Sequence, residues 1–405
     1  MSSTSASHVG YPTVAHPPWR MWIAAWIVTA VFILSNSATP LYVRWQTAIG
    51  FSSATLTVIF AAYIVGLLMT LLVAGQLSDR YGRRPVLLPG LAAALVACLL
   101  FAGAHTVTML IAARFLSGVA VGVVVTAGMA AVVDLGGPDR RRQASLIASV
   151  SMVLGAGLGP LLAGGIALSL AEPVIPIFAV EFGVLLTALT AILILPLQRH
   201  GTNADPGWRL HLPKVPRTNH RHLLFGIAIF GPGITATSFV LALGPSLLAH
   251  LLGVSSPLMA GGMACVMFLT ATGVQFAARR LSVRTIFLCG ATATILSMMG
   301  IALAATSSNP VALVVAAVLA GSGQGLGQLG GLTLIGLHVP GNHRAEANAV
   351  LNIGGYVPAG LMPVATGFVI DEVGLSFGAI SFAAVLIVIA ATGGAMVFRR
   401  LAEDR

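Results

Sequence analysis

The sequence predicts an all-α integral membrane protein whose twelve transmembrane helices form two pseudo-symmetric six-helix bundles. Its composition, its long apolar segments and a repeat between its halves lead to this prediction. Of the 405 residues, 57% are hydrophobic and 8% are charged, whereas roughly a quarter of the residues in soluble proteins are charged. A chain of this length could not bury so much apolar surface in its own core. The composition therefore excludes a soluble enzyme, and it excludes a disordered chain for the same reason.

Twelve segments are long and apolar enough to cross a bilayer, which takes about 20 residues per helix. They lie at about 21–43, 55–74, 85–103, 107–133, 144–169, 173–196, 222–249, 257–278, 285–305, 310–337, 347–370 and 375–398. Short segments with turn or polar residues separate them, as at 50–53 and 136–142. An even number of crossings places both termini on the same side of the membrane.

Two polar segments set the domain boundaries. Residues 1–19 are rich in serine, histidine and proline, so we expect a disordered cytoplasmic tail. Residues 198–221 carry several prolines and arginines between the sixth and seventh apolar segments, so we expect a cytoplasmic linker. The linker divides the chain into an N-terminal six-helix bundle at 20–197 and a C-terminal bundle with a short basic tail at 222–405.

The distribution of positive charge predicts the orientation. The formal net charge is +10, but 19 of the 21 lysines and arginines fall on the side of the two termini. Only Arg44 falls on the opposite side, and Arg114 lies within the fourth segment. Because positively charged loops stay in the cytoplasm, both termini are expected to be cytoplasmic, in a bacterial inner membrane. The charge therefore reflects topology and does not indicate nucleic-acid binding.

The two halves of the chain are related by a repeat. A shift of 200 residues places 75–90 on 275–290, so that Arg80 meets Arg280 and Arg84 meets Arg284. Each segment joins the second and third helices of its half. Parallel six-helix repeats of this kind are a recurrent plan of secondary transporters, whose substrate site lies at the midplane between the halves.

Three motifs resemble the major facilitator superfamily and its fold. The first motif lies in the loop after the second segment and resembles the superfamily signature between helices two and three. It is formed by Gly75, Asp79, Arg80, Gly82, Arg83 and Arg84. The fourth segment holds the second, Arg114, Gly118 and Gly122, which resembles its helix-four motif. The fifth segment holds the third, Gly155, Gly159, Pro160 and Gly164, which resembles the motif of its proton-coupled antiporters, with Ala163 in place of a glycine.

The resemblance implies a secondary active transporter of the drug/metabolite–proton antiporter branch. It implies proton-coupled efflux of a small organic molecule or drug by alternating access, with the proton gradient as energy source and no cofactor. Proton-coupled uptake of a nutrient is the alternative, and a non-transporting membrane sensor is a more distant one. The residues show no metal-ligand spacing, no nucleophile–base pair and no phosphate-binding loop, so we expect neither an enzyme nor a metal site. The expected partners are the bilayer, the substrate and protons, with no nucleic acid, and the expected state is a monomer.

The first motif is interpreted as a conformational gate. In the resembling family this loop gates the cytoplasmic opening, and Asp79 can pair with Arg80, Arg83 or the cluster that contains Arg140. Gly75 is expected to permit close helix approach, and Gly82 a tight turn with positive φ. The alternative is that the arginines only fix the topology.

Three charged residues are candidates for proton coupling. Arg114 lies inside a membrane span, where a charge is costly and usually functional; a structural hydrogen bond to a carbonyl is its alternative role. Glu181 lies about a third of the way into the sixth span, where apolar surroundings favour a protonated carboxyl group. It could instead pair with Arg114 or be solvated. Asp134, at the cytoplasmic end of the fourth span, fits a gate or cap better than a proton carrier.

Small and polar residues complete the candidate site. The glycines of the second and third motifs are expected to allow close helix packing, with Pro160 bending the fifth helix. The substrate-binding candidates are Asn36, Thr39, Tyr63, Arg114, Gln324, Gln328, Asn352 and Tyr356, because polar side chains avoid lipid. Hydrogen bonding between helices is the competing role. Many drug–proton antiporters carry an acid in the first span, but here that span offers only Asn36, Thr39 and Tyr42.

Overall fold

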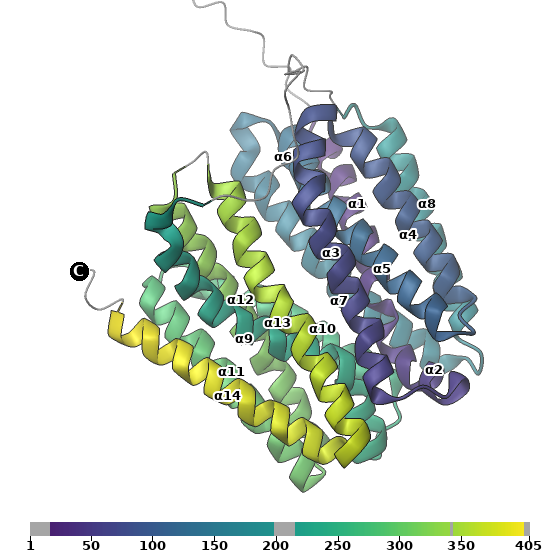
Figure 1. The fold of residues 1–405 in the computed structure, drawn as a ribbon. Helices are drawn as coiled ribbons and strands as arrows, with labels where there is room; N and C mark the ends of the chain where they lie inside the picture. The colour runs from purple at the N-terminus through teal and green to yellow at the C-terminus, as the bar shows by residue number, and fades with distance from the viewer. Residues whose placement is uncertain (1–16, 198–214, 341–342, 401–405) are drawn as a thin grey trace, which may run out of the picture.

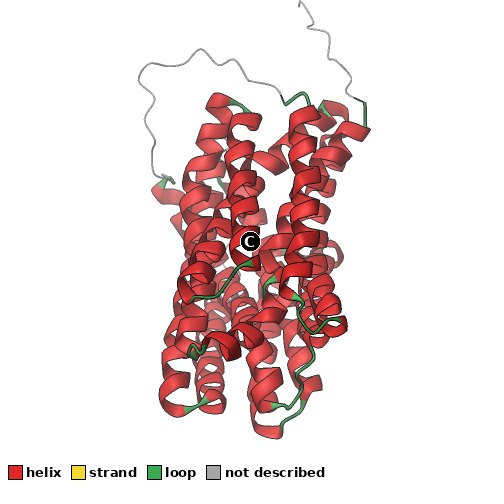
Figure 2. Ribbon diagram, turned by 90° about the vertical axis from the view of Figure 1, so that its right-hand side faces the viewer, coloured by secondary structure: helices red, strands yellow, loops and turns green. Residues whose placement is uncertain are grey.

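The computed structural model describes residues 17–197, 215–340 and 343–400, and Figure 1 shows them as two groups of helices. Nearly all of these residues are helical, and no strand occurs among them (Figure 2). The expected tail at 1–19 lies outside the described residues except for its last three positions, and so does most of the expected linker at 198–221.

The first half of the chain forms one bundle. Its helices are α1 (Trp19–Ser37), η1 (Thr39–Leu41), α2 (Tyr42–Ile49), α3 (Ser53–Tyr81), α4 (Arg83–Ala102), α5 (Val107–Val123), η2 (Val124–Gly128), α6 (Met129–Gly136), η3 (Pro138–Arg140), α7 (Arg141–Ser169) and α8 (Val174–Ile194). In this list η2 is a π-helical turn, and η1 and η3 are 3₁₀ turns.

The second half forms the other bundle. Its helices are η4 (Arg217–Asn219), α9 (His220–Ser246), η5 (Leu247–Leu251), α10 (Pro257–Ala278), α11 (Val283–Ser307), α12 (Pro310–His338), α13 (Arg344–Val373) and α14 (Leu375–Arg400). Across both bundles, the described residues contain twelve helical segments long and apolar enough to cross a membrane. The prediction of twelve spans in an all-α chain is confirmed.

Local sequence signals explain where the helices begin and end. The hydroxyls of Ser52 and Thr106 accept hydrogen bonds from backbone N–H groups in the first turns of α3 and α5, which are typical N-caps. Gly50 ends α2 with a φ of 78°, and Gly82 ends α3 with a φ of 93°. A left-handed conformation favours glycine, so the expected tight turn at Gly82 is confirmed.

Three spans depart from uninterrupted α-helix, and the seventh does so by running from α9 into the π turn η5. The first span runs on to Ile49 instead of ending near residue 43, and the turn that contains Pro40 divides it into α1 and α2. Proline has no N–H and cannot continue the hydrogen-bond ladder. The fourth span contains the π turn η2 between α5 and α6. Such turns occur often at functional sites, but no sequence signal predicted this one.

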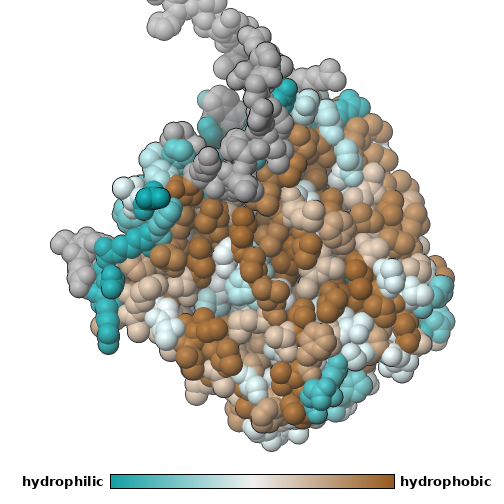
Figure 3. Space-filling view, viewed as in Figure 1, coloured by the Kyte–Doolittle hydropathy of each residue, from teal (hydrophilic) through white to brown (hydrophobic). Residues whose placement is uncertain are grey.

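Arginine-rich loops define one end of the molecule, which we call the basic end. It holds Arg80, Arg83, Arg84, Arg140, Arg141, Arg142, Arg279, Arg280, Arg284, Arg344, Arg399 and Arg400. We call the other end the opposite end. The surface between the two ends is mostly hydrophobic on the face seen in Figure 3, and hydrophilic side chains gather toward the ends.

The two bundles pack against each other through the halves of their helices that lie near the opposite end. In α3 and α13, Gly367 packs on Ala54 and Thr57. In α7 and α10, a Cβ added at Gly164 would lie 2.5 Å from the Pro257 carbonyl oxygen. Toward the basic end the helices of the two bundles diverge (Figures 1 and 2). The structure is therefore closed at the opposite end.

Glycines let α3 and α5 pack closely within the first bundle. A Cβ at Gly118 would collide with the Tyr63 carbonyl oxygen and lie 2.9 Å from the Leu67 nitrogen, and one at Gly122 would lie 2.7 Å from the Thr70 Cβ. The expected close packing of the second motif is confirmed.

Gly118→Ala is expected to destabilise the protein by about 1–3 kcal/mol, because its methyl group would meet backbone atoms that cannot move aside. Gly75→Ala is the matched control, since a Cβ there meets nothing within 4 Å and alanine favours a helix. Thermal unfolding in detergent should give a lower Tm for the first variant and an equal or higher Tm for the second. Equal Tm values for both variants would contradict the packing.

Candidate functional site between the bundles

Arg114 is the centre of the candidate site. It lies in α5, two turns from the helix start, and its side chain is buried. The guanidinium donates to the Tyr42 hydroxyl and, over 2.7 Å, to the Ser35 carbonyl oxygen. Both partners lie in the first span, on either side of its interruption. The interrupted first helix thus holds Arg114 from two directions.

Three aromatic rings surround the Arg114 guanidinium. Its central carbon lies 5.1 Å from the ring centre of Tyr42, 5.2 Å from that of Phe60 and 5.8 Å from that of Tyr63. These distances are typical of cation–π contacts. The Nη2 atom is buried without a hydrogen-bond partner, and no carboxylate in the described part of the chain pairs with this arginine. A buried cation without an anionic partner is costly, and Nη2 can donate to a polar or anionic ligand.

The site reaches across to the second bundle. Gly360 of α13 packs against Ile64 of α3, the residue after Tyr63, and Tyr356 precedes Gly360 by one helical turn. Its ring packs edge-on against Phe230 of α9, with the ring centres 6.4 Å apart. The structure therefore brings together three predicted site residues, Arg114, Tyr63 and Tyr356, from both bundles.

Two candidates of the first span are buried beside this cluster. Asn36 donates from Nδ2 to the Ser35 hydroxyl over 2.9 Å. The Thr39 hydroxyl oxygen is buried without a partner. Asn36 thus bonds to its neighbour in the helix, whereas the Thr39 hydroxyl oxygen can still bond to a ligand.

The polar candidates of the second bundle divide in the same way. The side-chain oxygens of Gln324 and Asn348 are buried and have no partner. Asn352 donates to the Asn348 carbonyl oxygen over 2.9 Å, and Gln275 donates to Gln328 over 3.5 Å. The unsatisfied oxygens are acceptors for a ligand or a water molecule. The Asn352 bond stays within α13, whereas the Gln275–Gln328 bond joins α10 to α12.

Glu181 of α8 is buried inside the first bundle. It is 5% exposed, the Ser37 hydroxyl is within hydrogen-bonding reach, and its Oε2 atom has no partner. Within the described chain it forms no ion pair with Arg114. The alternative of a static partner for Arg114 is therefore wrong in this conformation. Burial also excludes the alternative of a solvated carboxylate.

The gate motif is organised around Arg83. Its guanidinium donates to Asp79 over 2.7 Å, to Ser78 over 2.9 Å and to Asp134 over 2.9 Å. It therefore ties the end of α3 to the end of α6. Of the partners considered for Asp79, the structure selects Arg83, and it gives Asp134 the role of a partner in this network.

Two other arginines of the gate, Arg84 and Arg140, take no part in that network. Arg84 and Arg140 are exposed, and within the described chain neither pairs with a carboxylate. Arg80 lies over the Tyr81 ring, 5.4 Å from its centre. The expected close helix approach at Gly75 is wrong in this conformation, because a Cβ there would meet nothing within 4 Å. The helices diverge at this end, so no neighbour reaches it.

The third motif makes α7 a contact for both bundles. A Cβ at Gly155 would lie 2.6 Å from the Phe32 Cβ of α1, and one at Gly159 would collide with the Ile33 carbonyl of the same helix. Gly164 faces α10 instead, and the Pro160 carbonyl lies against Gly261 of α10. The expected position of this helix between the halves is confirmed.

Sequence reasoning missed two residues whose contacts organise the structure here. Tyr42 was visible as a polar residue in an apolar span, yet its bond to Arg114 depends on the turn at Pro40. Asp371, near the end of α13, accepts from the backbone N–H groups of Ser53 and Ala54 over 2.9 and 3.0 Å. These are the first residues of α3 in the other bundle, and no sequence pattern links them to Asp371.

Comparison with known proteins agrees with this architecture. The sequence profile of the Major Facilitator Superfamily matches residues 21–284 and 274–405. The multidrug resistance protein MdtL of Klebsiella pneumoniae is 32% identical over 122 residues, which are 29% of this chain and 31% of that protein. MdtL of Escherichia coli strain K12 / DH10B is 35% identical over 96 residues, 24% of each chain. The matched parts thus span less than a third of these relatives.

Two solved structures share the fold at low sequence identity. A variant of the nucleoside transporter NupG has a TM-score of 0.70 and 14% identity, over 95% of this chain and 99% of its own. A bacterial homologue of the human lysosomal transporter Spinster has a TM-score of 0.73 and 15% identity, over 96% and 98%. Twelve apolar helices in two bundles, three motifs at their expected places and a profile match along the whole length lead to one conclusion: the chain is a multi-pass membrane transporter that belongs to the Major Facilitator Superfamily.

Proposed function

We propose that this protein is a proton-coupled exporter of a small organic compound. The observation that carries this proposal is the buried, aromatic-lined Arg114 with an unpartnered Nη2 atom, placed beside the contact of α3 with α13 at Ile64 and Gly360. The similarity to MdtL, a multidrug resistance protein, favours efflux over other directions of transport. The glycine motif of α7, which contacts both bundles, supports antiport.

We infer that the protein lies in the inner membrane of a bacterial cell and that its basic end faces the cytoplasm, following the positive-inside rule. The conformation is then closed toward the outside, and the bundles would part at the outer end to release substrate. Asp371 and the start of α3 form a contact that must break in that movement. In alternating access, the contact of Asp371 with α3 would break as the outer end opens, and a contact at the gate motif would form as the cytoplasmic end closes.

The surroundings of Arg114 define the class of substrate that we propose. Aromatic rings favour a flat or amphipathic molecule, and the free guanidinium donor favours a carbonyl, a phenolate or a carboxylate. No carboxylate lies beside Arg114 in the described chain, so the site offers no anionic group that could pair with a cationic substrate. The expected substrate is therefore a neutral or anionic aromatic compound.

Glu181 is the proposed proton carrier. The Ser37 hydroxyl already donates to the Ile33 carbonyl over 2.7 Å, so its oxygen can accept a hydrogen bond from a protonated Glu181. A buried carboxylate without a cation would be strongly disfavoured. We therefore propose that Glu181 is neutral in this conformation and releases its proton when the bundle repacks.

Proton flux in everted membrane vesicles tests the proposed function. Vesicles from cells that contain the protein are energised, a panel of aromatic acids, dyes and antibiotics is added, and an acid-sensitive fluorophore reports the lumenal pH. An exporter should release lumenal protons in response to at least one neutral or anionic compound. A proton flow in the opposite sense would establish nutrient uptake instead, and no response from folded protein to any compound would favour a sensor.

Glu181→Gln is expected to remove substrate-driven proton release while the protein stays folded, because glutamine replaces a neutral carboxyl group with little change in volume. The matched control is Glu172→Gln, an exposed acid that pairs with Arg44 over 2.6 Å at the opposite end. The control should retain most of the wild-type signal. Wild-type proton release from Glu181→Gln vesicles would show that Glu181 is not the proton carrier. The proposed direction of transport would still hold.

A further inference from the structure

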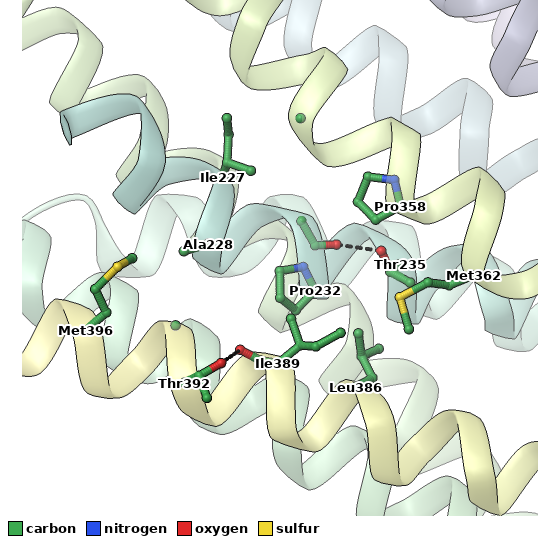
Figure 4. Close-up of a pocket in the computed structure, with 13 residues that line it drawn as sticks. Ile227, Ala228, Pro232, Thr235, Pro358, Met362, Leu386, Ile389, Thr392 and Met396 are labelled. Carbon is green, nitrogen blue, oxygen red and sulfur yellow. Dashed lines mark hydrogen bonds between the residues drawn. The ribbon is translucent and has the colours of Figure 1, made fainter. Parts of the chain in front are cut away.

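An apolar groove lies on the flank of the second bundle, where α9, α13 and α14 meet (Figure 4). Its volume is about 330 Å³, near the lower end of the range for small-molecule sites. Its lining residues lie within 227–235, 354–362 and 386–396, one stretch from each helix. Ile389 at its rim is 40% exposed. The groove therefore opens to the side of the bundle.

The wall of the groove offers no free hydroxyl proton. Its two hydroxyl residues each donate to a carbonyl oxygen of their own helix, Thr235 to Gly231 over 2.7 Å and Thr392 to Ile389 over 2.8 Å (Figure 4). The other lining side chains belong to alanine, proline, methionine, leucine and isoleucine, with glycines between them. Such a wall favours a hydrocarbon occupant.

Two of the three helices that line the groove, α9 and α14, carry an arginine on the face of the groove, at the basic end. Arg221 precedes the lining residue Ala228 of α9 by seven positions, and Arg400 follows the lining residue Gly393 of α14 by seven. Seven residues are two helical turns, about 10 Å along the axis, so each arginine shares the face of the groove. The two helix ends meet, because the Arg221 guanidinium donates to the Arg400 carbonyl oxygen over 3.5 Å.

A third arginine adds positive charge at this corner. Arg284 of α11 donates to the Phe398 carbonyl oxygen over 3.2 Å, and its guanidinium lies 4.6 Å from the centre of the Phe398 ring. Within the described chain neither Arg284 nor Arg400 pairs with a carboxylate. Their charge is available to an anion.

We propose that the groove and the arginines beyond it form a binding site for one anionic phospholipid. An acyl chain fills the groove against α9, α13 and α14, and the phosphate binds at Arg221 and Arg400. Phospholipid is the occupant because a hydrocarbon site and an anion site follow each other along the same helix faces, and because the groove opens on the flank of a membrane protein. Arginines next to a membrane span attract anionic lipid headgroups in this way.

Native mass spectrometry of the delipidated full-length protein in detergent tests the site. Dioleoylphosphatidylglycerol, dioleoylphosphatidylcholine and inorganic phosphate are added in separate titrations. We expect one tightly bound phosphatidylglycerol, at least about fivefold weaker binding of phosphatidylcholine, and no retained phosphate. Equal binding of the two lipids would overturn the proposal, and so would retention of phosphate alone, because then the groove would contribute nothing.

Two pairs of variants separate the headgroup site from the groove. Removing both charges with Arg221→Gln and Arg400→Gln should weaken phosphatidylglycerol binding at least about fivefold, whereas Arg279→Gln with Arg280→Gln, the same loss of charge elsewhere at the basic end, should not. Thr392→Trp places a ring in the mouth of the groove and should weaken binding similarly. Ala391→Trp, on an adjacent exposed face of α14, should not. Unchanged binding in both test variants would show that lipid binds only as a general annulus.

Discussion

Arg114→Met is expected to reduce transport of the substrate by roughly 10–100-fold, the loss that follows when a charge-assisted hydrogen bond worth about 1.5–3 kcal/mol is removed. The Arg114 guanidinium links the Ser35 carbonyl, the Tyr42 hydroxyl and the rings of Phe60 and Tyr63. Methionine fills a similar space without a donor. Because apolar replacements of buried charges are often neutral for stability, the loss should appear in transport and not in folding. Substrate flux into everted vesicles, normalised to folded protein, measures it.

The control for this variant is Arg44→Met. Arg44 lies at the opposite end, where it is partly exposed and pairs with Glu172. Its removal should leave transport within about twofold of wild type, since exposed ion pairs contribute little. Arg114→Lys separates charge from geometry, because lysine keeps the charge but cannot form the guanidinium's paired contacts. Full transport by Arg114→Met would remove Arg114 from the substrate site and leave it a structural role.

Asp371→Asn is expected to shift the protein toward a conformation open at the opposite end. The two Asp371 oxygens accept from the Ser53 and Ala54 backbone N–H groups, at the positive end of the α3 dipole. An asparagine amide has one acceptor oxygen and no charge, so one of the two bonds and the dipole interaction are lost. Spin labels on Thr47 and Ser255, at the opposite end, should move apart, and labels on Ser145 and Ala345, at the basic end, should approach. Pulsed electron resonance measures both distances in a Cys289→Ser background, which removes the exposed thiol.

Glu372→Gln is the matched control for Asp371→Asn. Glu372 is the next residue and is also exposed, and within the described chain it has no bond to α3. Its distance distributions should match those of the wild type. If Asp371→Asn and Glu372→Gln gave the same distributions as the wild type, the carboxylate would not hold the bundles together.

The sequence was sufficient for the architecture, because the signals for it are local. An apolar span of about 20 residues can be recognised from its own sequence. A cap such as Ser52 and a glycine with positive φ such as Gly82 determine the helix end at which they lie. The same is true of the helix contacts of Gly118 and Gly159, since a small residue at a regular spacing marks a packing face whatever it packs on. The burial of Arg114 also follows from its position alone.

The contacts that give the site its function could not be read from the sequence. Asp371 and Ser53 are 318 residues apart in the chain, and helical periodicity does not tell which end of the bundles is closed. Glu181 was a candidate from its position, but whether it pairs with Arg114 depends on how α8 turns within the bundle. The choice of Arg83 among several nearby arginines depends on the sharp turn at Gly82, which aims one side chain between two acids.

The most direct test of proton-driven export uses purified protein in liposomes that contain a trapped pH indicator. A compound that was active in the vesicle screen is loaded inside at high concentration, with equal pH on both sides, and its outward movement is started by dilution. The proposed antiport predicts that protons move inward as the compound leaves, so that the lumen becomes acidic in liposomes with wild-type protein but not with Glu181→Gln. A lumen that becomes alkaline would show the compound and the proton moving together, which would contradict the exchange mechanism.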